Sequence, residues 1–328
     1  MNIKNKISPL VELLRGLVSY LPGFDAPVFT RTGGTNSARY CYSVWLRHLV
    51  MAKESGVFSE MPKVIAELGP GDSLGMGLAA LLSGGEKYYA FDVVKYADIE
   101  KNLEILDELI ELFRLKKSIP NDKEFPLVKP YLENYSFPDE ILNEELLKNS
   151  LKEERLDLIR ESIKNPEKEK GMIVYQVPWN DSSIIKKNSV DMIFSQATLE
   201  HVDDIENTYQ IMYEWLKLGG FISHQIDLKC HGTSEEWNGH WTYSDPAWKV
   251  IRGKRQWLLN RLPCSEHIKL LEKNNFNSIC IKKIKTPSKI ARKSLADKFK
   301  SVSEEDLKIS GVFFIAEKYG GKNNRNGR

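Results

Sequence analysis

The sequence predicts an α/β fold in which a Rossmann-like, mostly parallel sheet carries helices on its faces. An apolar run at 64–68 ends in a turn with glycines at 69, 71 and 75, and an apolar helical pattern follows. A strand, turn and helix of this kind suit a nucleotide, because glycines let the backbone approach a ligand and the helix start offers unpaired N–H groups. Further short apolar runs alternate with helical patterns, which is typical of a parallel sheet.

The composition of the 328 residues is that of an ordinary globular protein, with 41% hydrophobic and 28% charged residues. The formal net charge is only +2, so the sequence predicts no nucleic-acid partner. The four cysteines are far apart and form no C-x-x-C motif. This favours reduced thiols and a cytoplasmic location over a disulfide framework. We find neither a run of 18 apolar residues nor the pattern of a signal peptide.

The N-terminal part is predicted to form two helices, of which the first, at 7–22, has one apolar face. The residues of that face are Ile7, Leu10, Val11, Leu14, Leu17 and Val18. Two interpretations stay open: the face packs on the domain or on a partner subunit of a homodimer, or it makes a peripheral contact with a membrane. The second helix begins near Ala38, with Asn36 or Ser37 as its cap, and ends near Lys53. The polar loop before it lies either over the ligand crevice or on the surface.

Seven short apolar runs are predicted to form the strands of the sheet. They lie at 64–68, 87–91, 172–176, 190–195, 218–227, 278–284 and 311–316. Asp92 follows the second run, about 20 residues after the glycines. A carboxylate at this position can accept hydrogen bonds from both hydroxyls of a ribose, although it can also simply cap the following turn.

The chain is predicted to consist of a helical cap at 1–60, one domain at 61–320 and a disordered tail at 321–328. The charged, largely helical segment at about 99–170 is too long for a simple crossover. We interpret it as a helical insertion that covers the active site or binds a partner. The segment at 228–262 is irregular and holds four of the seven tryptophans. Long irregular loops of this kind are usually functional.

Two further helices are predicted between and before the closing strands. One is short and lies at 265–274, and the other is basic and lies at 288–308. Leu295, Phe299 and Leu307 are the expected apolar anchors of the second helix.

Taken in this order, the motifs resemble the class I S-adenosylmethionine-dependent methyltransferases, in particular the broad type 11 group. The resemblance rests on residues 67–75 (Glu-Leu-Gly-Pro-Gly-Asp-Ser-Leu-Gly), on Asp92, and on the segments 191–202 and 216–222. It covers about residues 62–227, with the insertion unmatched. It implies S-adenosyl-L-methionine as cofactor, an active enzyme and a seven-stranded sheet that closes in a reversed hairpin.

Two other nucleotide-binding motifs do not fit the glycine turn. A nicotinamide dinucleotide enzyme favours G-x-G-x-x-G, whereas this turn has G-x-G-x-x-x-G. A P-loop requires G-K-[ST], which the sequence lacks.

The resemblance assigns the cofactor to the carboxyl ends of the strands. The implied contacts are Glu67, Gly69, Pro70, Gly71, Asp92, Val93, Gln176, Val177, Ser195 and Gln196. The glycine turn lies under the methionine part, which Glu67 contacts directly or through water. Asp92 holds the ribose hydroxyls, while Val93 and the residues after the third strand flank the adenine. Ser195 and Gln196 start the loop that faces the methionine end.

Methyl transfer is an in-line displacement at a sulfonium methyl group, so the protein mainly supplies alignment and, for a hydroxyl acceptor, a base. Histidine suits this role because its pKa lies near neutrality. The candidate bases are His201, His224, His231 and His240, and each of them can instead be a packed or surface residue. Glu200 and His201 either position their loop or contact the substrate. We assign no metal, although a metal-assisted variant through Asp227, His231 and His240 is an alternative.

The aromatic and polar loop at 228–261 suits stacking and hydrogen bonding to a polar ring. It predicts O-methylation of a saccharide or another small polar acceptor. The segment 260–267 also loosely resembles methyltransferases of polysaccharide biosynthesis. The competing hypothesis is a non-catalytic binding or scaffold protein on the same fold, with the helical insertion as its partner surface.

Overall fold

The computed structural model describes residues 9–21, 34–167, 170–179, 182–255 and 257–320. The predicted tail at 321–328 therefore lies outside the described residues, as does Ile7 of the first predicted helix.

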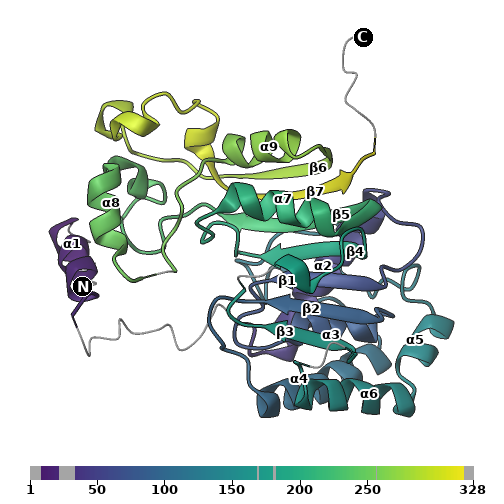
Figure 1. Cartoon of the computed structure of the whole chain (residues 1–328). Helices are drawn as coiled ribbons and strands as arrows, with labels where there is room; N and C mark the ends of the chain where they lie inside the picture. Colours follow the sequence, from purple (N-terminus) through teal and green to yellow (C-terminus); the bar gives the residue numbers. More distant parts are fainter. Residues whose placement is uncertain (1–8, 22–33, 168–169, 180–181, 256, 321–328) are drawn as a thin grey trace, which may run out of the picture.

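A seven-stranded sheet forms the centre of the molecule, in the order β3-β2-β1-β4-β5-β7-β6 (Figure 1). The strands are β1 (Val64–Leu68), β2 (Lys87–Phe91), β3 (Ile173–Gln176), β4 (Val190–Gln196), β5 (Leu216–Asp227), β6 (Phe276–Lys285) and β7 (Ile309–Lys318). Strand β7 is antiparallel to both of its neighbours, and the other pairs are parallel. The predicted mostly parallel sheet with a reversed final hairpin is thus confirmed.

Helices cover both faces of the sheet. The first face carries α2 (Ala38–Glu54), α3 (Gly75–Leu82), α4 (Ile99–Arg114), α5 (Glu144–Ser150) and α6 (Glu153–Lys164). The second face carries α7 (Ile205–Trp215) and α9 (Cys264–Lys273), together with the short turn η1 (Ser182–Ile184). Each face therefore has its own apolar core, as the side chains of successive strand residues alternate between the two faces.

Helix α2 is an integral part of the first core, although it precedes the sheet in sequence. The Ser37 hydroxyl accepts a hydrogen bond from the Tyr40 N–H, which confirms the predicted cap. Trp45 is fully buried, and its indole N–H donates to the Ser83 hydroxyl over 2.8 Å. The two helices of the predicted N-terminal cap thus belong to different parts of the molecule, because α1 (Pro9–Val18) packs elsewhere.

The segment between α4 and α5 wraps around α2 and is held there by a buried arginine. The Arg47 guanidinium donates to the carbonyls of Pro120, Val128 and Pro130 over 2.9–3.0 Å, and the side chain is fully buried. Three carbonyls are thereby satisfied inside the protein, where an unpaired one would be costly. The predicted helical insertion is helical at α4, α5 and α6 and irregular between them.

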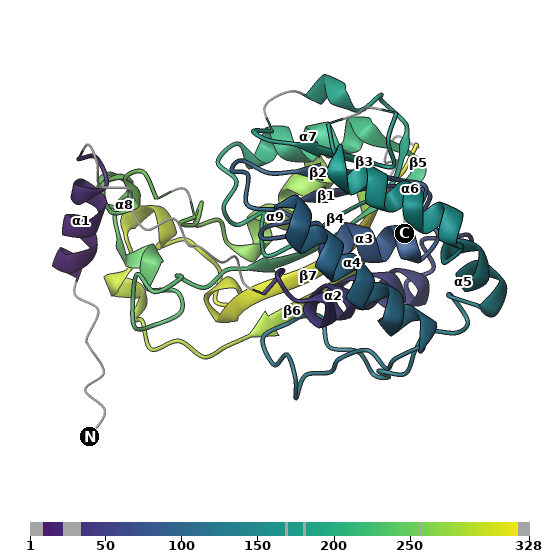
Figure 2. The ribbon, with the colours of Figure 1, turned by 90° about the horizontal axis from the view of Figure 1, so that it is seen from below.

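A smaller lobe lies beyond the carboxyl ends of β4 and β5, on the left in Figures 1 and 2. We define the lobe as residues 9–21, 228–262 and 286–308 without the undescribed residue 256. Its regular elements are α1, η2 (Gly239–Thr242), α8 (Asp245–Arg252), η3 (Arg292–Ser294), η4 (Asp297–Phe299) and η5 (Asp306–Lys308). Two small apolar clusters hold it together, one around Trp241 and one around Trp248. No helix of the described residues is both long and apolar enough to cross a bilayer.

The predicted helix at 288–308 is wrong, because the segment forms only 3-10 turns. Leu295 and Phe299 are anchors as expected, but they reach the Trp241 cluster from a loop. The Arg292 guanidinium fixes this loop by donating to the carbonyls of Lys300 and Val302. These hydrogen bonds from Arg292 take the place of the helical backbone hydrogen bonds that the spacing of the apolar residues predicted.

Helix α1 packs on α8 through Glu12 and Gly16, not through its predicted apolar face. The Glu12 carboxylate is buried and accepts a hydrogen bond from Arg255 over 3.1 Å. Gly16 lies so close to the backbone of α8 that a Cβ atom there would come within 1.8 Å of the Val250 carbonyl oxygen. Leu10 and Leu14 of the apolar face are exposed. Packing of that face on the domain is therefore wrong, whereas contact with a partner subunit or a membrane stays a prediction.

Candidate functional site

The glycine turn after β1 is a tight bend at the carboxyl edge of the sheet. Gly69 and Gly71 have φ angles of +71° and +75°, in the left-handed region that favours glycine. The Gly69 N–H donates to the Phe91 carbonyl over 2.8 Å, which ties the turn to β2. A Cβ atom on Gly69 would lie 2.5 Å from the side chain of Thr198 in the loop after β4. Only glycine fits between β1 and this loop, and Pro70 is buried within the same turn.

Asp92 at the end of β2 faces this turn. Its carboxylate accepts hydrogen bonds from the N–H groups of Gly71 over 3.3 Å and Val93 over 2.7 Å. Burial raises the pKa of this carboxyl group, while the N–H donors act in the opposite direction. The Val93 side chain is 60% exposed. The structure thus brings Gly69, Gly71, Asp92 and Val93 together at one edge.

Glu67 lies in the core directly before the turn. The side chain is fully buried, and one carboxylate oxygen accepts a hydrogen bond from the Tyr88 hydroxyl over 2.5 Å. The other oxygen, Oε1, has no hydrogen-bond partner among the described residues. Burial raises the pKa of Glu67 to about 8, so the group is neutral at pH 7.

The ends of β2 and β3 lie side by side at the predicted adenine position. The Asp92 N–H donates to the Gln176 carbonyl over 3.2 Å, and the Trp179 N–H donates to the Asp92 carbonyl over 2.8 Å. Gln176 and Val177 are half-buried. Their backbone therefore runs beside Asp92, as predicted from the sequence.

Ser195 and Gln196 at the end of β4 both have protein partners. The Ser195 hydroxyl lies 2.7 Å from Nδ1 of His224 in the core of the second face. Gln196 lies on the first face, where its Oε1 is 3.1 Å from Nε2 of His48 and its amide donates to the Lys129 carbonyl. In the loop after β4, the Thr198 side chain lies against Gly69, a contact that sequence reasoning missed. No sequence pattern indicates this contact, because it joins residues more than a hundred positions apart.

Four ionisable side chains meet where the loop after β4 passes the end of β5, and we call them the edge cluster. They are Glu200, His201, Asp227 and His231. The imidazole rings of the two histidines have their centroids 5.0 Å apart. One Glu200 oxygen accepts from the Asp227 N–H over 3.2 Å and lies 4.0 Å from Nε2 of His201. An Asp227 oxygen lies 3.8 Å from Nε2 of His231.

The edge cluster has a buried member, Glu200, and two histidines at its rim that are partly exposed. Glu200 is 1% exposed, whereas the side chains of His201 and His231 are 26% and 25% exposed. Burial raises the pKa of Glu200 well above its ordinary value. Burial, with His231 and Arg252 nearby, lowers the pKa of His201 to about 3. Burial acts to raise the pKa of Asp227, but His231 and Lys229 together hold it below its usual range.

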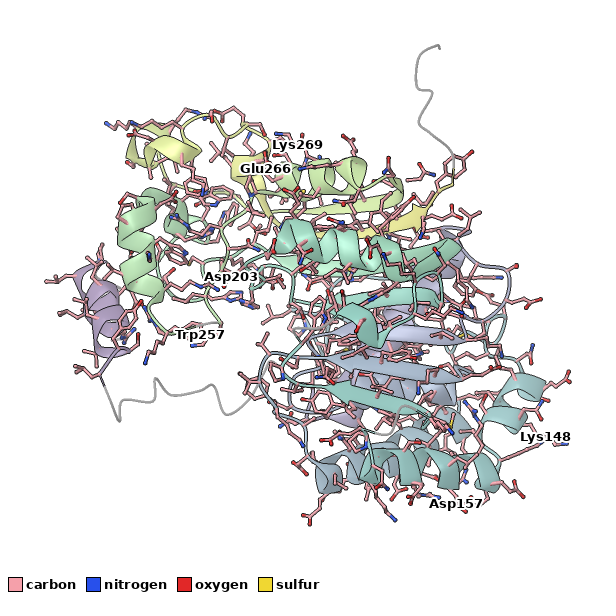
Figure 3. All side chains as sticks on the ribbon, in the orientation of Figure 1. Lys148, Asp157, Asp203, Trp257, Glu266 and Lys269 are labelled. Carbon is pink, nitrogen blue, oxygen red and sulfur yellow. The ribbon has the colours of Figure 1, made fainter. Side chains whose placement is uncertain are left out.

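The lobe holds the loop that carries Glu200 and His201. The Asn260 side-chain amide donates to the carbonyls of Leu199 and Val202 over 2.9 and 3.0 Å, and its backbone N–H donates to the Glu200 carbonyl. Arg252 of α8 forms an ion pair with Asp203. Figure 3 shows Asp203 and Trp257 between α8 and the sheet. Asn260 is thus a positioning residue that the sequence did not reveal.

The two remaining candidate bases lie in packed interiors. His224 is fully buried beside Ser195, and burial lowers its pKa well below the ordinary value. His240 is 1% exposed between Trp241 and Trp248, and burial lowers its pKa to about 3. Of the four candidates, the structure brings only His201 and His231 to the rim of the edge cluster.

A cavity of about 920 Å³ opens beside the start of α4. Its walls include Leu74, Tyr96, Asp98, Asn102, Ile163 and Tyr175. The cavity borders the glycine turn through Leu74, but none of the predicted cofactor contacts lines it.

Comparisons with known proteins point to one family. The family model described as a methyltransferase domain matches residues 141–223, which include β3, β4 and α7 but not the glycine turn. A search of curated proteins found no match.

Solved structures also resemble the chain. An S-adenosylmethionine-dependent methyltransferase from Mesorhizobium loti is 11% identical, with 80% of this chain and 94% of that chain covered and a TM-score of 0.39. A methyltransferase of the same description from Methanosarcina mazei is 12% identical, with coverages of 81% and 97% and a TM-score of 0.41. Phosphoethanolamine N-methyltransferase 2 of Haemonchus contortus, in complex with S-adenosyl-L-methionine, is 14% identical, with coverages of 86% and 56% and a TM-score of 0.39. Likenesses this weak carry no argument about chemistry.

The assignment rests on the family-model match and on the architecture. The sheet order β3-β2-β1-β4-β5-β7-β6 with a reversed β7 is the arrangement that the sequence resemblance implied. The family-model match covers β3, β4 and the first part of β5, which follow one another in sequence. Residues 141–223 therefore match the methyltransferase-domain family, and the sheet around them has the architecture expected of a class I S-adenosylmethionine-dependent methyltransferase.

Proposed function

We propose that this methyltransferase transfers the methyl group to a hydroxyl of a small polar acceptor, and that the acceptor is a saccharide. The observation that carries the proposal is the edge cluster, because it gathers two partly exposed imidazole rings and two carboxylates at the carboxyl edge of the sheet. Hydroxyl acceptors need help to lose a proton, and this cluster offers groups that provide it.

The cofactor contacts follow from the glycine turn. We propose that the cofactor ribose binds at Asp92, whose carboxylate lies beside Gly71 and Val93. Its two hydroxyls would replace part of the backbone hydrogen bonding of this carboxylate. The methionine part then lies against Gly69, where Thr198 forms the opposite wall. Glu67 acts from beneath the turn, since it is buried against Tyr88.

The methyl carbon would thereby be directed toward the loop after β4, which carries Thr198 together with Glu200 and His201 of the edge cluster. The acceptor oxygen forms a bond to the methyl carbon while the carbon–sulfur bond breaks, and the electron pair stays on sulfur in S-adenosylhomocysteine. The hydroxyl proton passes to the edge cluster and from there to solvent. Alignment of oxygen, carbon and sulfur supplies most of the rate gain, and proton removal supplies the rest.

The lobe supports a polar ring as acceptor. It places Trp257 near His201 of the edge cluster, while Asn260 holds the loop that carries His201. Aromatic faces of this kind bind sugar rings by stacking. A nitrogen acceptor would depend less on the carboxyl groups and imidazoles of the edge cluster for removal of a proton.

The test combines labelled cofactor with two variants. The purified chain is incubated with S-adenosylmethionine that carries a labelled methyl group and with saccharides extracted from the source cells, and the products are hydrolysed and analysed by mass spectrometry. We expect an O-methyl sugar, and a drop in rate of about 100-fold or more in His201→Ala and His231→Ala. Glu206→Gln, an exposed carboxylate of α7, is the matched control and should keep full rate.

A labelled methyl group on a nitrogen or carbon atom of the acceptor would contradict O-methylation. Full turnover in both histidine variants would show that the edge cluster does not take part. Cofactor affinity measured in the same variants separates a loss of chemistry from a loss of binding.

A further inference from the structure

The edge cluster contains a donor set that suits a metal ion. One ligand atom from each of Glu200, His201 and His231 lies within 4.8 Å of the other two. Glu200 is 1% exposed, and its Oε2 has no hydrogen-bond partner among the described residues. Nδ1 of His201 also has no hydrogen-bond partner among the described residues. A carboxylate oxygen that is buried without a partner costs free energy, so its retention calls for an explanation.

We propose that Glu200, His201 and His231 bind a divalent transition-metal ion that holds the acceptor hydroxyl. This inference rests on the proposed function for the identity of the acceptor group, but not for the site itself. The sequence had suggested His240 as a ligand in the metal-assisted alternative. The structure instead packs His240 between tryptophans and places Glu200 and His201 beside His231.

The ligand types favour particular ions. Two imidazoles with one carboxylate suit zinc, manganese, iron or cobalt, whereas magnesium and calcium prefer oxygen ligands. Three protein ligands leave at least one coordination position open for a substrate oxygen. Metal–nitrogen bonds of about 2.0–2.1 Å require the three side chains to close in slightly from their present separations. Side-chain rotation at the partly exposed rim allows this movement.

The surroundings of the three ligands resemble the outer partners of known metal sites. Asp227 has an oxygen 3.8 Å from Nε2 of His231, where a carboxylate orients a ligating imidazole. The Asp227 N–H donates to Glu200 and fixes the carboxylate whose other oxygen is unpaired. Nζ of Lys229 lies 3.3 Å from the other oxygen of Asp227. Asp227 is therefore an outer partner in this account.

The ion would change how the acceptor loses its proton. A hydroxyl bound to a divalent cation has a lowered pKa, so a weak base is sufficient to remove the proton. The methyl transfer itself is unchanged, because the cofactor still supplies the leaving group.

Cobalt(II) and zinc(II) are the probes for this site. The full chain is treated with a chelator, dialysed and titrated with cobalt(II) by visible absorption and with zinc(II) by calorimetry. We expect one ion per chain and the absorption bands of a site with nitrogen ligands. Glu200→Gln, His201→Ala and His231→Ala should each weaken binding by at least 100-fold. Asp227→Asn, which removes the outer partner, should weaken it by about 10- to 100-fold.

Two controls keep the result interpretable. Glu206→Gln changes an exposed carboxylate of the neighbouring helix and should leave metal affinity unchanged. Circular dichroism shows whether each variant folds, and Glu200→Gln keeps the size of the buried side chain.

The outcomes separate this inference from the proposed function. Absence of stoichiometric binding, or equal affinity in the ligand variants, would overturn the metal site, and O-methyl transfer that continues in excess chelator would then leave the proposed function standing. Stoichiometric binding that depends on all three ligands supports the site even if no O-methylated product forms, in which case only the proposed function fails.

Discussion

Glu67 is a buried carboxyl group directly before the glycine turn. It is the residue before the last of β1, beneath the glycines, and has Tyr88 as its hydrogen-bond partner. Its sequence position before G-x-G predicted a contact to the cofactor, but not its complete burial. Burial depends on which residues of α3 and β2 cover it, and these contacts are set by packing rather than by the motif.

The raised pKa of Glu67 predicts a pH dependence of stability. Its pKa is about 8 in the folded chain and near the ordinary 4.5 in the unfolded chain. Between these values the folded state binds one more proton, so stability falls as the pH rises, by up to about 1.4 kcal/mol per pH unit. Glu67→Gln removes this contribution. We expect denaturant unfolding of the cofactor-free chain at pH 5, 6, 7 and 8 to show a shallower decline in the variant.

The exposed Glu86, next to the start of β2, provides the control for this prediction. Glu86→Gln should leave the pH slope of the unfolding free energy as it is in the unmodified chain. Equal slopes in the Glu67→Gln variant and the unmodified chain would mean that Glu67 is ionised in the folded state.

The histidines show the limit of sequence reasoning at the residue scale. The sequence proposed His201, His224, His231 and His240 with no means of ranking them. His201 and His231 are thirty positions apart, and they meet because β4 and β5 are adjacent and both run toward the same edge. His224 points into the core of the second face. Successive strand residues point to opposite faces, and its neighbour Ser223 points to the first face. These facts follow from strand register, which composition and spacing do not specify.

Among the elements, the strands were the most predictable and the segments that pack without periodicity the least. The central apolar runs predicted strand positions well because buried parallel strands must be apolar on both faces. The segment 288–308 has helical spacing of apolar residues, yet its anchors reach the tryptophans of the lobe from 3-10 turns. Helix α1 buries Glu12 because Arg255 neutralises it, which an apolar pattern cannot reveal.

The segment between α4 and α5 depends on Arg47 for its position. Arg47→Ala leaves the buried carbonyls of Val128 and Pro130 without their donor, while that of Pro120 keeps only the Ser43 hydroxyl. We expect a loss of about 3 kcal/mol or more in unfolding free energy, and faster proteolysis within residues 115–143. Arg47→Lys retains the charge but cannot reach three carbonyls at once, so its loss should be intermediate.

Denaturant unfolding and limited proteolysis check this prediction. Arg160, which forms ion pairs on the exposed side of α6, is the matched control, and Arg160→Ala should cost less than about 1 kcal/mol. Equal stability losses in the two alanine variants would contradict the role assigned to Arg47.

At the scale of the whole molecule, our proposal places the cofactor at the edge of the sheet and the acceptor beside the lobe. The glycine turn, Asp92 and the loop after β4 come from the part of the chain that the resemblance covered. The lobe is assembled from three distant segments, and its Asn260 holds the loop that carries Glu200. The fold class and the meeting of the glycine turn with Asp92 at one edge were therefore predictable from sequence, whereas cofactor binding there stays a prediction. The edge cluster was not, because it depends on which strands are adjacent and on the path of the loops that follow them.

Binding of S-adenosylmethionine at Asp92 is the central claim of this account, and calorimetric titration tests it most directly. The unmodified chain should bind one cofactor per chain. Asp92→Asn should weaken the affinity by roughly 10- to 100-fold, since hydrogen bonds to a charged group contribute about 1.5–3 kcal/mol. Asp157→Asn, on the exposed side of α6 (Figure 3), should bind as the unmodified chain does. No binding at high cofactor concentration, or unchanged affinity in Asp92→Asn, would contradict the account.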